Sequence, residues 1–237
     1  NEDPMYILAG LPFIAPDYSS AWLLKDVQME YLQEKFDKKG LMILYTAPWP
    51  GQGFYTKFPV NSVSDFSGKK LRIYSTATQQ MGSMLGFNAT ILPFAEIPQA
   101  FSTGLIEALF TSPQTGIDIQ AWDNTKHFTY AGAIFSKNAV VVTKKAFNAL
   151  SKGDQSNMLA AAKKAELRGW EMSAETTKKQ IDILKKNGMS SKNAPDEVIS
   201  KMKSIGLEMM KNWRSKASPE ANAAVSYTHL RAHETDT

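Results

Sequence analysis

The alternation of strand-like and helix-like runs between residues 71 and 115 constrains the fold most strongly. Apolar runs bounded by turn residues predict three strands, at residues 71–75, 89–93 and 106–110. Helix-like runs separate them, and this alternation predicts an α/β fold with a mostly parallel sheet. Small ligands bind at the carboxyl ends of strands in such sheets. Arg72 and the loop at residues 111–115 are therefore the first candidates for a site.

Further apolar runs predict elements on both sides of this stretch. A helix-like run at residues 155–187 is the longest, and at about 1.5 Å per residue such a helix could cross two lobes. The other predicted elements are strands at residues 5–11, 41–46, 54–57 and 139–142, a strand or extended segment at 128–135, and helices at 21–38, 117–125, 144–150 and 194–215.

The composition narrows the class of protein. The chain has 237 residues, 43% of them hydrophobic, which suits one large domain or two small lobes with a core. The net charge of +4 comes with scattered lysines, which argues against a nucleic-acid partner. Cysteine is absent, so the sequence offers neither disulfides nor thiolate metal ligands. No apolar run approaches the roughly 18 residues of a membrane helix.

Signals for an enzyme, a metal or a cofactor are weak. His127 is the only histidine before the last twelve residues, so a catalytic or metal constellation would have one histidine at most. The Gly51-Gln52-Gly53 run lacks the third glycine and the helix of a phosphate-binding loop. We therefore expect no enzyme, no metal and no cofactor. An enzyme on a related α/β fold, with His127 as its acid or base, is the less favoured alternative.

Arg72 allows two interpretations. An arginine centred in an apolar strand is costly to bury unless it meets an anion. Its planar guanidinium matches a carboxylate through two parallel hydrogen bonds. One interpretation is a binding site for a carboxylate ligand, and the other is a structural ion pair with Glu96 or Glu107. The sequence alone does not favour either.

The loop after the third predicted strand carries small polar side chains that could hydrogen-bond ligand oxygens. The alternative is an ordinary loop that caps the next helix. These candidates are Thr111, Ser112, Gln114 and Thr115.

Aromatic side chains are also candidates, because they could line a pocket for a ring or a sugar face. Core packing is the better general expectation for aromatic residues. The aromatic candidates are Trp49, Phe54, Tyr55, Tyr74 and Trp122.

Both ends of the chain depart from these patterns. Residues 226–237 are polar and aperiodic and carry two of the three histidines, so we interpret them as a non-native tail of vector or adapter origin. The first residues resemble the interior of a longer chain. We therefore expect a signal peptide and the first strand and helix of the protein to precede Asn1.

Three segments together resemble the substrate-binding proteins of tripartite ATP-independent periplasmic (TRAP) transporters, the DctP-like family. The first is DFSGKKLRI at residues 65–73, and the second is LPFAEIPQAFSTGLIEA at residues 92–108. The third is NAVVVTKKAFNAL at residues 138–150, followed by Asp154 and Gln155. Each segment alone is weak evidence, whereas the combination is specific.

The resemblance implies a two-lobed periplasmic-binding-protein fold of the α/β class with a long lobe-spanning helix. The first lobe would comprise residues 1–49 and 137–176 and be incomplete. The second lobe would comprise residues 50–136 and 177–225.

The resemblance also implies a function: a periplasmic, monomeric protein that captures an organic acid and delivers it to TRAP permease subunits. Arg72 matches the arginine that grips the ligand carboxylate in the family. Thr111 or Ser112 stands where the family often has an asparagine, and Gln52 stands where some members have a second arginine. These departures favour a ring-bearing acid or a sugar acid over a short dicarboxylate. A sensory module for an organic acid is the alternative.

Overall fold

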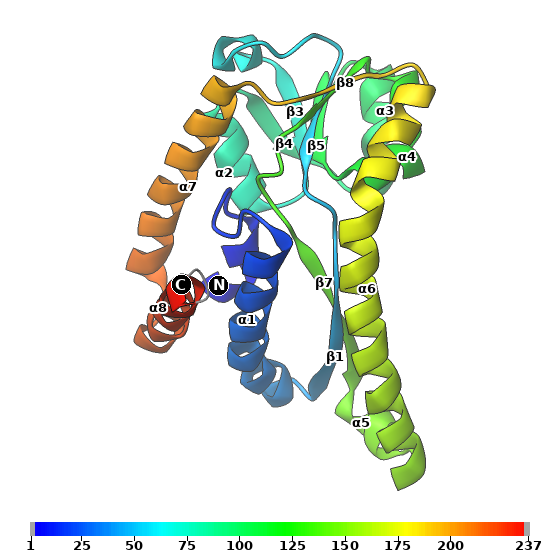
Figure 1. Ribbon diagram of the computed structural model, residues 1–237, viewed down its shortest axis with the longest axis vertical. Helices are drawn as coiled ribbons and strands as arrows, with labels where there is room; N and C mark the ends of the chain where they lie inside the picture. The colour runs from blue at the N-terminus through cyan, green and yellow to red at the C-terminus, as the bar shows by residue number, and fades with distance from the viewer. Residues whose placement is uncertain (1–2, 235–237) are drawn as a thin grey trace.

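The computed structural model describes residues 3–234 and has the predicted mixed α/β architecture, with a six-stranded and a two-stranded sheet (Figure 1). Three of the five pairings in the larger sheet are parallel, namely β4 with β3, β3 with β5, and β6 with β8. The central strand β2 runs antiparallel to both of its neighbours. In spatial order the strands are β4 (Asn88–Ile91), β3 (Lys70–Ile73), β5 (Ala108–Thr111), β2 (Gly53–Thr56), β6 (His127–Tyr130) and β8 (Ser190–Asn193).

Short helices connect these strands, and serine side chains define where two of them begin. Ser75 Oγ accepts a hydrogen bond from the Thr78 N–H at the start of α2, and Ser112 Oγ accepts one from the Thr115 N–H at the start of α4. Both helices begin directly after a strand, which brings their N-termini to the carboxyl edge of the sheet. The connecting helices are η2 (Val63–Phe66), α2 (Thr76–Met84), η3 (Phe94–Glu96), α3 (Ile97–Ser102), α4 (Pro113–Asp118) and η4 (Ala121–Asp123).

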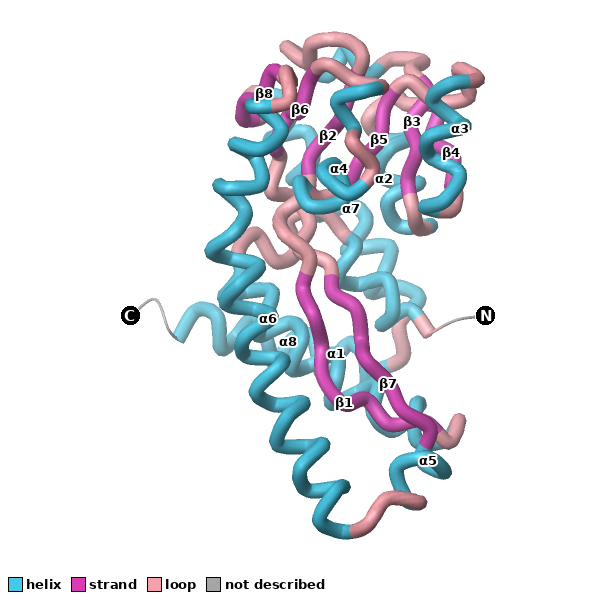
Figure 2. Tube along the Cα trace, turned by 90° about the vertical axis from the view of Figure 1, so that its right-hand side faces the viewer, coloured by secondary structure: helices cyan, strands magenta, loops and turns pink. Residues whose placement is uncertain are grey.

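The smaller sheet is an antiparallel ribbon of β1 (Leu41–Pro48) and β7 (Lys137–Thr143), and α5 (Lys144–Asn148) follows it. It extends away from the larger sheet beside α1 (Tyr18–Lys38) and α6 (Lys152–Lys186) (Figure 2). The Glu166 carboxylate on α6 accepts hydrogen bonds from the N–H and the hydroxyl of Thr46 on β1 (2.8 and 2.6 Å). These contacts fasten the ribbon to α6.

The long helix predicted at residues 155–187 is the continuous helix α6. Its 35 residues correspond to roughly 52 Å. It contacts β1 in the ribbon and β8 in the larger sheet, so it runs along both (Figure 1). After β8, α7 (Asp196–Lys216) and α8 (Pro219–Glu234) complete the described chain.

Three local predictions were wrong. Residues 5–11 are not a strand, because the Asp3 carboxylate caps the Met5 N–H and Pro4 sits at the first turn of the 3-10 helix η1 (Pro4–Gly10). The helix predicted at residues 117–125 is interrupted at Gln120, whose φ of 49° separates α4 from η4. The strand β8 was not predicted, because its four residues are polar or charged.

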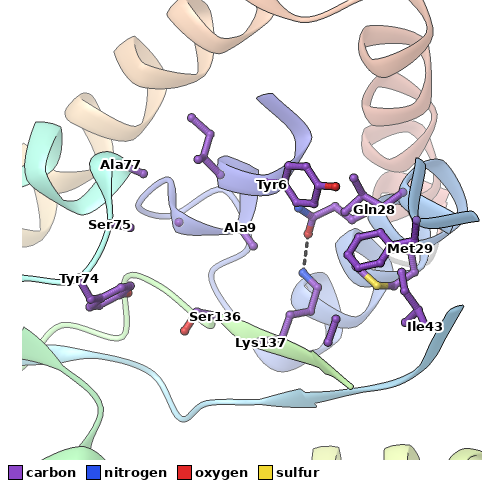
Figure 3. Close-up of a pocket in the computed structure, with 15 residues that line it drawn as sticks. Tyr6, Ala9, Gln28, Met29, Ile43, Tyr74, Ser75, Ala77, Ser136 and Lys137 are labelled. Carbon is purple, nitrogen blue, oxygen red and sulfur yellow. Dashed lines mark hydrogen bonds between the residues drawn. The ribbon is translucent and has the colours of Figure 1, made fainter. Parts of the chain in front are cut away.

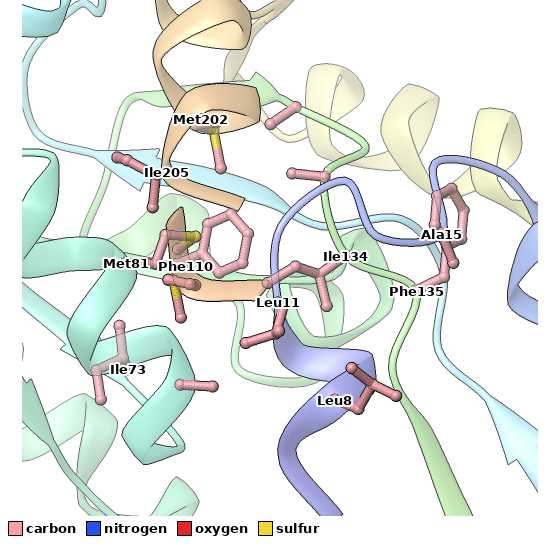
Figure 4. Packing of buried hydrophobic residues seen from close by; sticks show 14 of the residues in the cluster. Leu8, Leu11, Ala15, Ile73, Met81, Phe110, Ile134, Phe135, Met202 and Ile205 are labelled. Atoms are coloured by element: carbon pink, nitrogen blue, oxygen red, sulfur yellow. The ribbon is translucent and has the colours of Figure 1, made fainter. Parts of the chain in front are cut away.

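The hydrophobic core joins segments from both predicted lobes. Leu8 and Leu11 of the N-terminal segment share one buried cluster with Phe110 of β5 and Met202 and Ile205 of α7 (Figure 4). Both strands of the ribbon fall in the ranges predicted for the first lobe, and all six strands of the larger sheet fall in those predicted for the second. The boundary proposed at residues 176 and 177 lies inside α6, and the division into lobes stays a prediction.

The packing of Gly116 on α4 gives a testable prediction. A Cβ added at Gly116 would lie 2.0 Å from the hydroxyl oxygen of the fully buried Tyr55. We expect Gly116→Ala to lower the free energy of unfolding by about 1–3 kcal/mol, because the core must shift to admit the methyl group. Urea denaturation measures this change.

A matched control is available on α6. At Gly169 an added Cβ meets no atom within 4 Å. Gly169→Ala should therefore raise stability by about 0.5–1 kcal/mol through helix propensity. Equal effects of the two substitutions would contradict the packing described for Gly116.

Candidate ligand-binding site

A cavity of about 280 Å³ lies at the carboxyl ends of β3 and β5, where the α/β pattern predicted a site. Its walls come from both sheets: β3, β5 and the start of α4 on one side, and the ends of β1 and β7 on the other. The lining residues are Trp49, Gln52, Arg72, Tyr74, Phe94, Thr111, Ser112, Thr115, Ser136, Lys137 and Asn138.

Arg72 is the most buried charged group of the cavity wall, with 4% of its surface exposed. Its Nε and Nη2 both donate to the carbonyl oxygen of Leu92, at 3.1 and 2.9 Å. A guanidinium has five N–H donors, so this single acceptor fixes its orientation and leaves other donors for a ligand. Burial lowers the pKa of Arg72 from its ordinary value, yet an arginine stays charged in proteins.

The structure does not contain the ion pair that was the alternative for Arg72. Among residues 3–226, whose side chains the structure describes, no carboxylate lies within ion-pair distance of the guanidinium. The Glu107 carboxylate accepts instead from the backbone N–H of Lys70 at 3.3 Å, and Glu96 is exposed. The buried positive charge of Arg72 therefore has only a neutral protein partner.

A chain of hydrogen bonds joins three residues of the cavity wall, Tyr74, Gln52 and Ser136. The Tyr74 hydroxyl donates to Gln52 Oε1 at 2.7 Å, and Gln52 Nε2 donates to Ser136 Oγ at 3.0 Å. Burial raises the pKa of Tyr74 to about 12, so its phenol keeps the proton that it donates. These hydrogen bonds connect the end of β3 to both segments that cross between the sheets, residues 49–52 and 131–136.

The polar loop after β5 lines the cavity in part. Thr111, Ser112 and Thr115 are all buried and belong to its wall. Ser112 also caps α4, and its hydroxyl lies 3.1 Å from that of Thr115. The two roles weighed for this loop, helix capping and contact with the cavity, thus occur together.

Four of the candidate residues lie outside this cavity, and one of them, Phe54, is fully buried in the hydrophobic core. Gln114 points to α6, where its Oε1 accepts from Gln180 Nε2 at 3.0 Å. Tyr55 is fully buried in the core, and its hydroxyl donates to the Ser112 carbonyl oxygen at 3.2 Å. Trp122 packs against the same hydrophobic cluster as Tyr55. The general expectation that aromatic residues pack in the core describes Tyr55 and Trp122, whereas Trp49 and Tyr74 line the cavity.

Four lining residues were missed in the sequence analysis: Phe94, Ser136, Lys137 and Asn138. Phe94 is 53% exposed at the rim, and Asn138 Oδ1 accepts from the indole N–H of Trp49 at 3.3 Å. Ser136 and Lys137 stand where the chain enters β7. A lysine next to a β-branched strand carries no special sequence signal, so its place in the cavity emerges only from the pairing of β1 with β7.

His127 lies away from this cavity. In the sheet it pairs with Thr56, whereas the cavity lies at the other end of β2, next to Gly53 and its partner Tyr130. The enzyme interpretation thereby loses its best candidate residue. Within residues 3–226, no cluster of three or more His, Cys, Asp or Glu side chains could hold a metal ion. No helix in the described part of the chain has the length and apolar character needed to cross a membrane.

Comparison with known proteins identifies the family. A family model named DctP and described as bacterial extracellular solute-binding protein, family 7, matches residues 2–216. The chain belongs to this family. Family members and the solved structures below are solute receptors rather than enzymes, in agreement with the resemblance seen in the three sequence segments.

Three solved structures are similar over nearly the whole chain. DctP7 of Bordetella pertussis, described as an extracytoplasmic solute receptor binding pyroglutamic acid, is 36% identical with a TM-score of 0.93. The match covers 97% of this chain and 76% of that chain. DctP6 of the same organism, with the same description, is 35% identical, with the same coverage and TM-score. A marine metagenome TRAP solute-binding protein specific for pyroglutamate is 31% identical, with a TM-score of 0.89 and coverage of 96% and 75%.

Curated relatives are more distant. A protein named solute-binding protein from Chromohalobacter salexigens is 24% identical over 187 residues, which are 75% of this chain and 55% of that protein. The chain therefore spans little more than half the length of this relative.

A more distant solved structure shares the fold. It is a TRAP periplasmic solute-binding protein from Sulfitobacter with bound β-D-galacturonate, 20% identical with a TM-score of 0.82, and the match covers 94% of this chain and 74% of that chain.

The hydrogen-bond chain behind the cavity predicts the effect of removing one hydroxyl. Tyr74→Phe leaves Gln52 Oε1, on a residue 3% exposed, without its donor. We expect a loss of about 1–3 kcal/mol in the free energy of unfolding, because a buried acceptor is left unsatisfied. Chemical denaturation of the purified variant measures it.

Tyr6→Phe serves as the control. Tyr6 is 37% exposed, and no hydrogen bond from its hydroxyl to the described residues is present. Its removal should change stability by less than about 0.5 kcal/mol. If Tyr74→Phe proved as mild as Tyr6→Phe, the Tyr74–Gln52 bond would not contribute to the frame of the site.

Proposed function

We propose that this protein is the solute receptor of a TRAP transporter and that it acts outside the cytoplasm. It captures a small ring-bearing organic acid through Arg72 and delivers this acid to membrane permease subunits. The single observation that carries the proposal is the guanidinium of Arg72: it is buried, lines a cavity, and has a neutral carbonyl as its hydrogen-bonding partner among the described residues. A carboxylate would supply the missing negative charge through two parallel hydrogen bonds.

The size and lining of the cavity support a small acid. Its volume of about 280 Å³ is below the roughly 300–1,000 Å³ of pockets for drug-sized ligands. Thr111, Ser112 and Thr115 offer hydroxyl groups, and Trp49 and Tyr74 offer aromatic faces. Such a lining suits a ring that bears polar atoms, and the three relatives with 31–36% identity are described as binding pyroglutamate, a five-membered lactam acid.

The position of the cavity supports a transport role. Arg72 belongs to the larger sheet, whereas Asn138 belongs to the ribbon. An acid that contacts both sheets stabilises one relative arrangement of them, and a permease can recognise that arrangement.

Calorimetric titration with L-pyroglutamate, benzoate, galacturonate and succinate tests the proposal. We expect the wild-type protein to bind L-pyroglutamate most tightly. Arg72→Met should lower the affinity at least about 30-fold, because the paired hydrogen bonds to the carboxylate are lost (about 2–5 kcal/mol). Arg72→Lys should give an intermediate affinity, since lysine keeps the charge but not the planar fork.

Arg168→Met is the matched control, because Arg168 lies on the exposed face of α6 and pairs with Glu171 at 3.1 Å. It should leave the affinity unchanged. Unaltered binding by Arg72→Met would remove the arginine–carboxylate mechanism, and a wild-type protein that binds no acid would refute the proposed function itself.

A further inference from the structure

A second cavity of about 280 Å³ adjoins the first. The two share three lining residues, Tyr74, Ser136 and Lys137. The other walls of the second cavity come from η1, α1 and the ribbon, as Tyr6, Gln28 and Ile43 illustrate (Figure 3). Lys137 therefore stands on the boundary between the cavity that holds Arg72 and a neighbouring space of equal volume.

The ammonium group of Lys137 is held by a neutral side chain. Its Nζ donates to Gln28 Oε1, and the side chain extends from β7 toward α1 (Figure 3). Gln28 is 2% exposed, and its own Nε2 donates to the Met5 carbonyl oxygen at 2.8 Å. The bond to Met5 settles the orientation of the amide, so its oxygen faces Lys137.

No negative charge compensates Lys137 among the described residues. None of the ion pairs within residues 3–226 includes it. Lys25, the nearby lysine on α1, has two carboxylate partners of its own, Asp26 at 2.6 Å and Glu166 at 3.6 Å. Because an ammonium has three N–H donors and Gln28 takes one, Lys137 has donors left. The first cavity is thus lined by two basic residues, Arg72 and Lys137, and by no carboxylate.

We propose that Lys137 is a ligand-binding residue that determines specificity: it donates to a second acceptor on the acid whose carboxylate binds Arg72. This inference rests on the proposed function. Lys137 would favour small acids that carry a second hydrogen-bond acceptor, such as a lactam carbonyl. Acids of the same size that lack this acceptor would bind more weakly. Arg72 lies on β3 and Lys137 on β7, so such an acid bridges the two sheets through both of its polar ends.

The charges around Lys137 make this binding dependent on pH. Burial and the charge of Lys25 lower the pKa of Lys137 to about 7. The other titratable groups that face it are Tyr6 from η1, Tyr74 after β3, and Arg72 in the adjoining cavity. A bound acceptor favours the protonated ammonium and raises its pKa. Binding above pH 7 therefore takes up a proton, and the affinity falls as the pH rises further.

The test compares L-pyroglutamate with cyclopentanecarboxylate, an acid with a ring of equal size and no second acceptor. We expect the wild-type protein to prefer L-pyroglutamate by about 10- to 100-fold, the range for a hydrogen bond to a charged group. In Lys137→Met and Lys137→Gln this preference should fall to within about threefold, while binding of cyclopentanecarboxylate stays dependent on Arg72. Lys145→Met, an exposed position on α5, should keep the wild-type preference.

Proton uptake provides a readout that a merely structural role would not change. Calorimetry at pH 8 in two buffers of different ionisation enthalpy should reveal uptake of a proton by the wild-type protein and none by Lys137→Met. Two results overturn the inference while leaving the proposed function intact: a wild-type protein without preference between the two acids, or folded Lys137 variants that keep the preference. Failure of the wild-type protein to bind either acid overturns both proposals.

Discussion

The buried guanidinium of Arg72 is the constraint on which the rest of the site depends. Burying a charge without a counter-ion is costly, and the hydrogen-bond acceptor of this guanidinium among the described residues is the neutral Leu92 carbonyl oxygen. That carbonyl follows β4, the strand paired with β3, so the sheet itself determines the orientation of the guanidinium. An anion bound in the cavity would offset this cost, and the proposed function rests on that expectation.

The polar groups near Arg72 differ in whether other protein groups already occupy their hydrogen-bonding atoms. Gln52 stands where some members of the family have a second arginine, but both ends of its side-chain amide are engaged by Tyr74 and Ser136. It fixes the two crossing segments against β3 and adds no charge. The second cation of the cavity is Lys137, which reaches it from another strand. Two basic side chains, Arg72 and Lys137, thus line the cavity, although Gln52 is neutral.

The two sheets are held together by elements that belong to neither. The helix α6 runs along both, and the Glu166 carboxylate fixes its position on the ribbon through Thr46. The indole N–H of Trp170 donates to the Thr46 hydroxyl at 3.1 Å, one turn further along the same helix. The hydrophobic core also runs from the N-terminal segment through α7 to the larger sheet.

The sequence by itself determined the α/β class and the long helix, and it singled out Arg72 and the loop after β5 as candidates. Local periodicity and one charge in an apolar strand are properties of neighbouring residues, so they can be seen in the sequence. Only the tertiary structure decided which side chains share the cavity. The pairing of β1 with β7 brings Ser136 and Lys137 to the same cavity as Arg72. Gln114 turns to α6, whereas its neighbours Ser112 and Thr115 line the cavity. Such choices follow from long-range packing and strand register, and no local pattern encodes them.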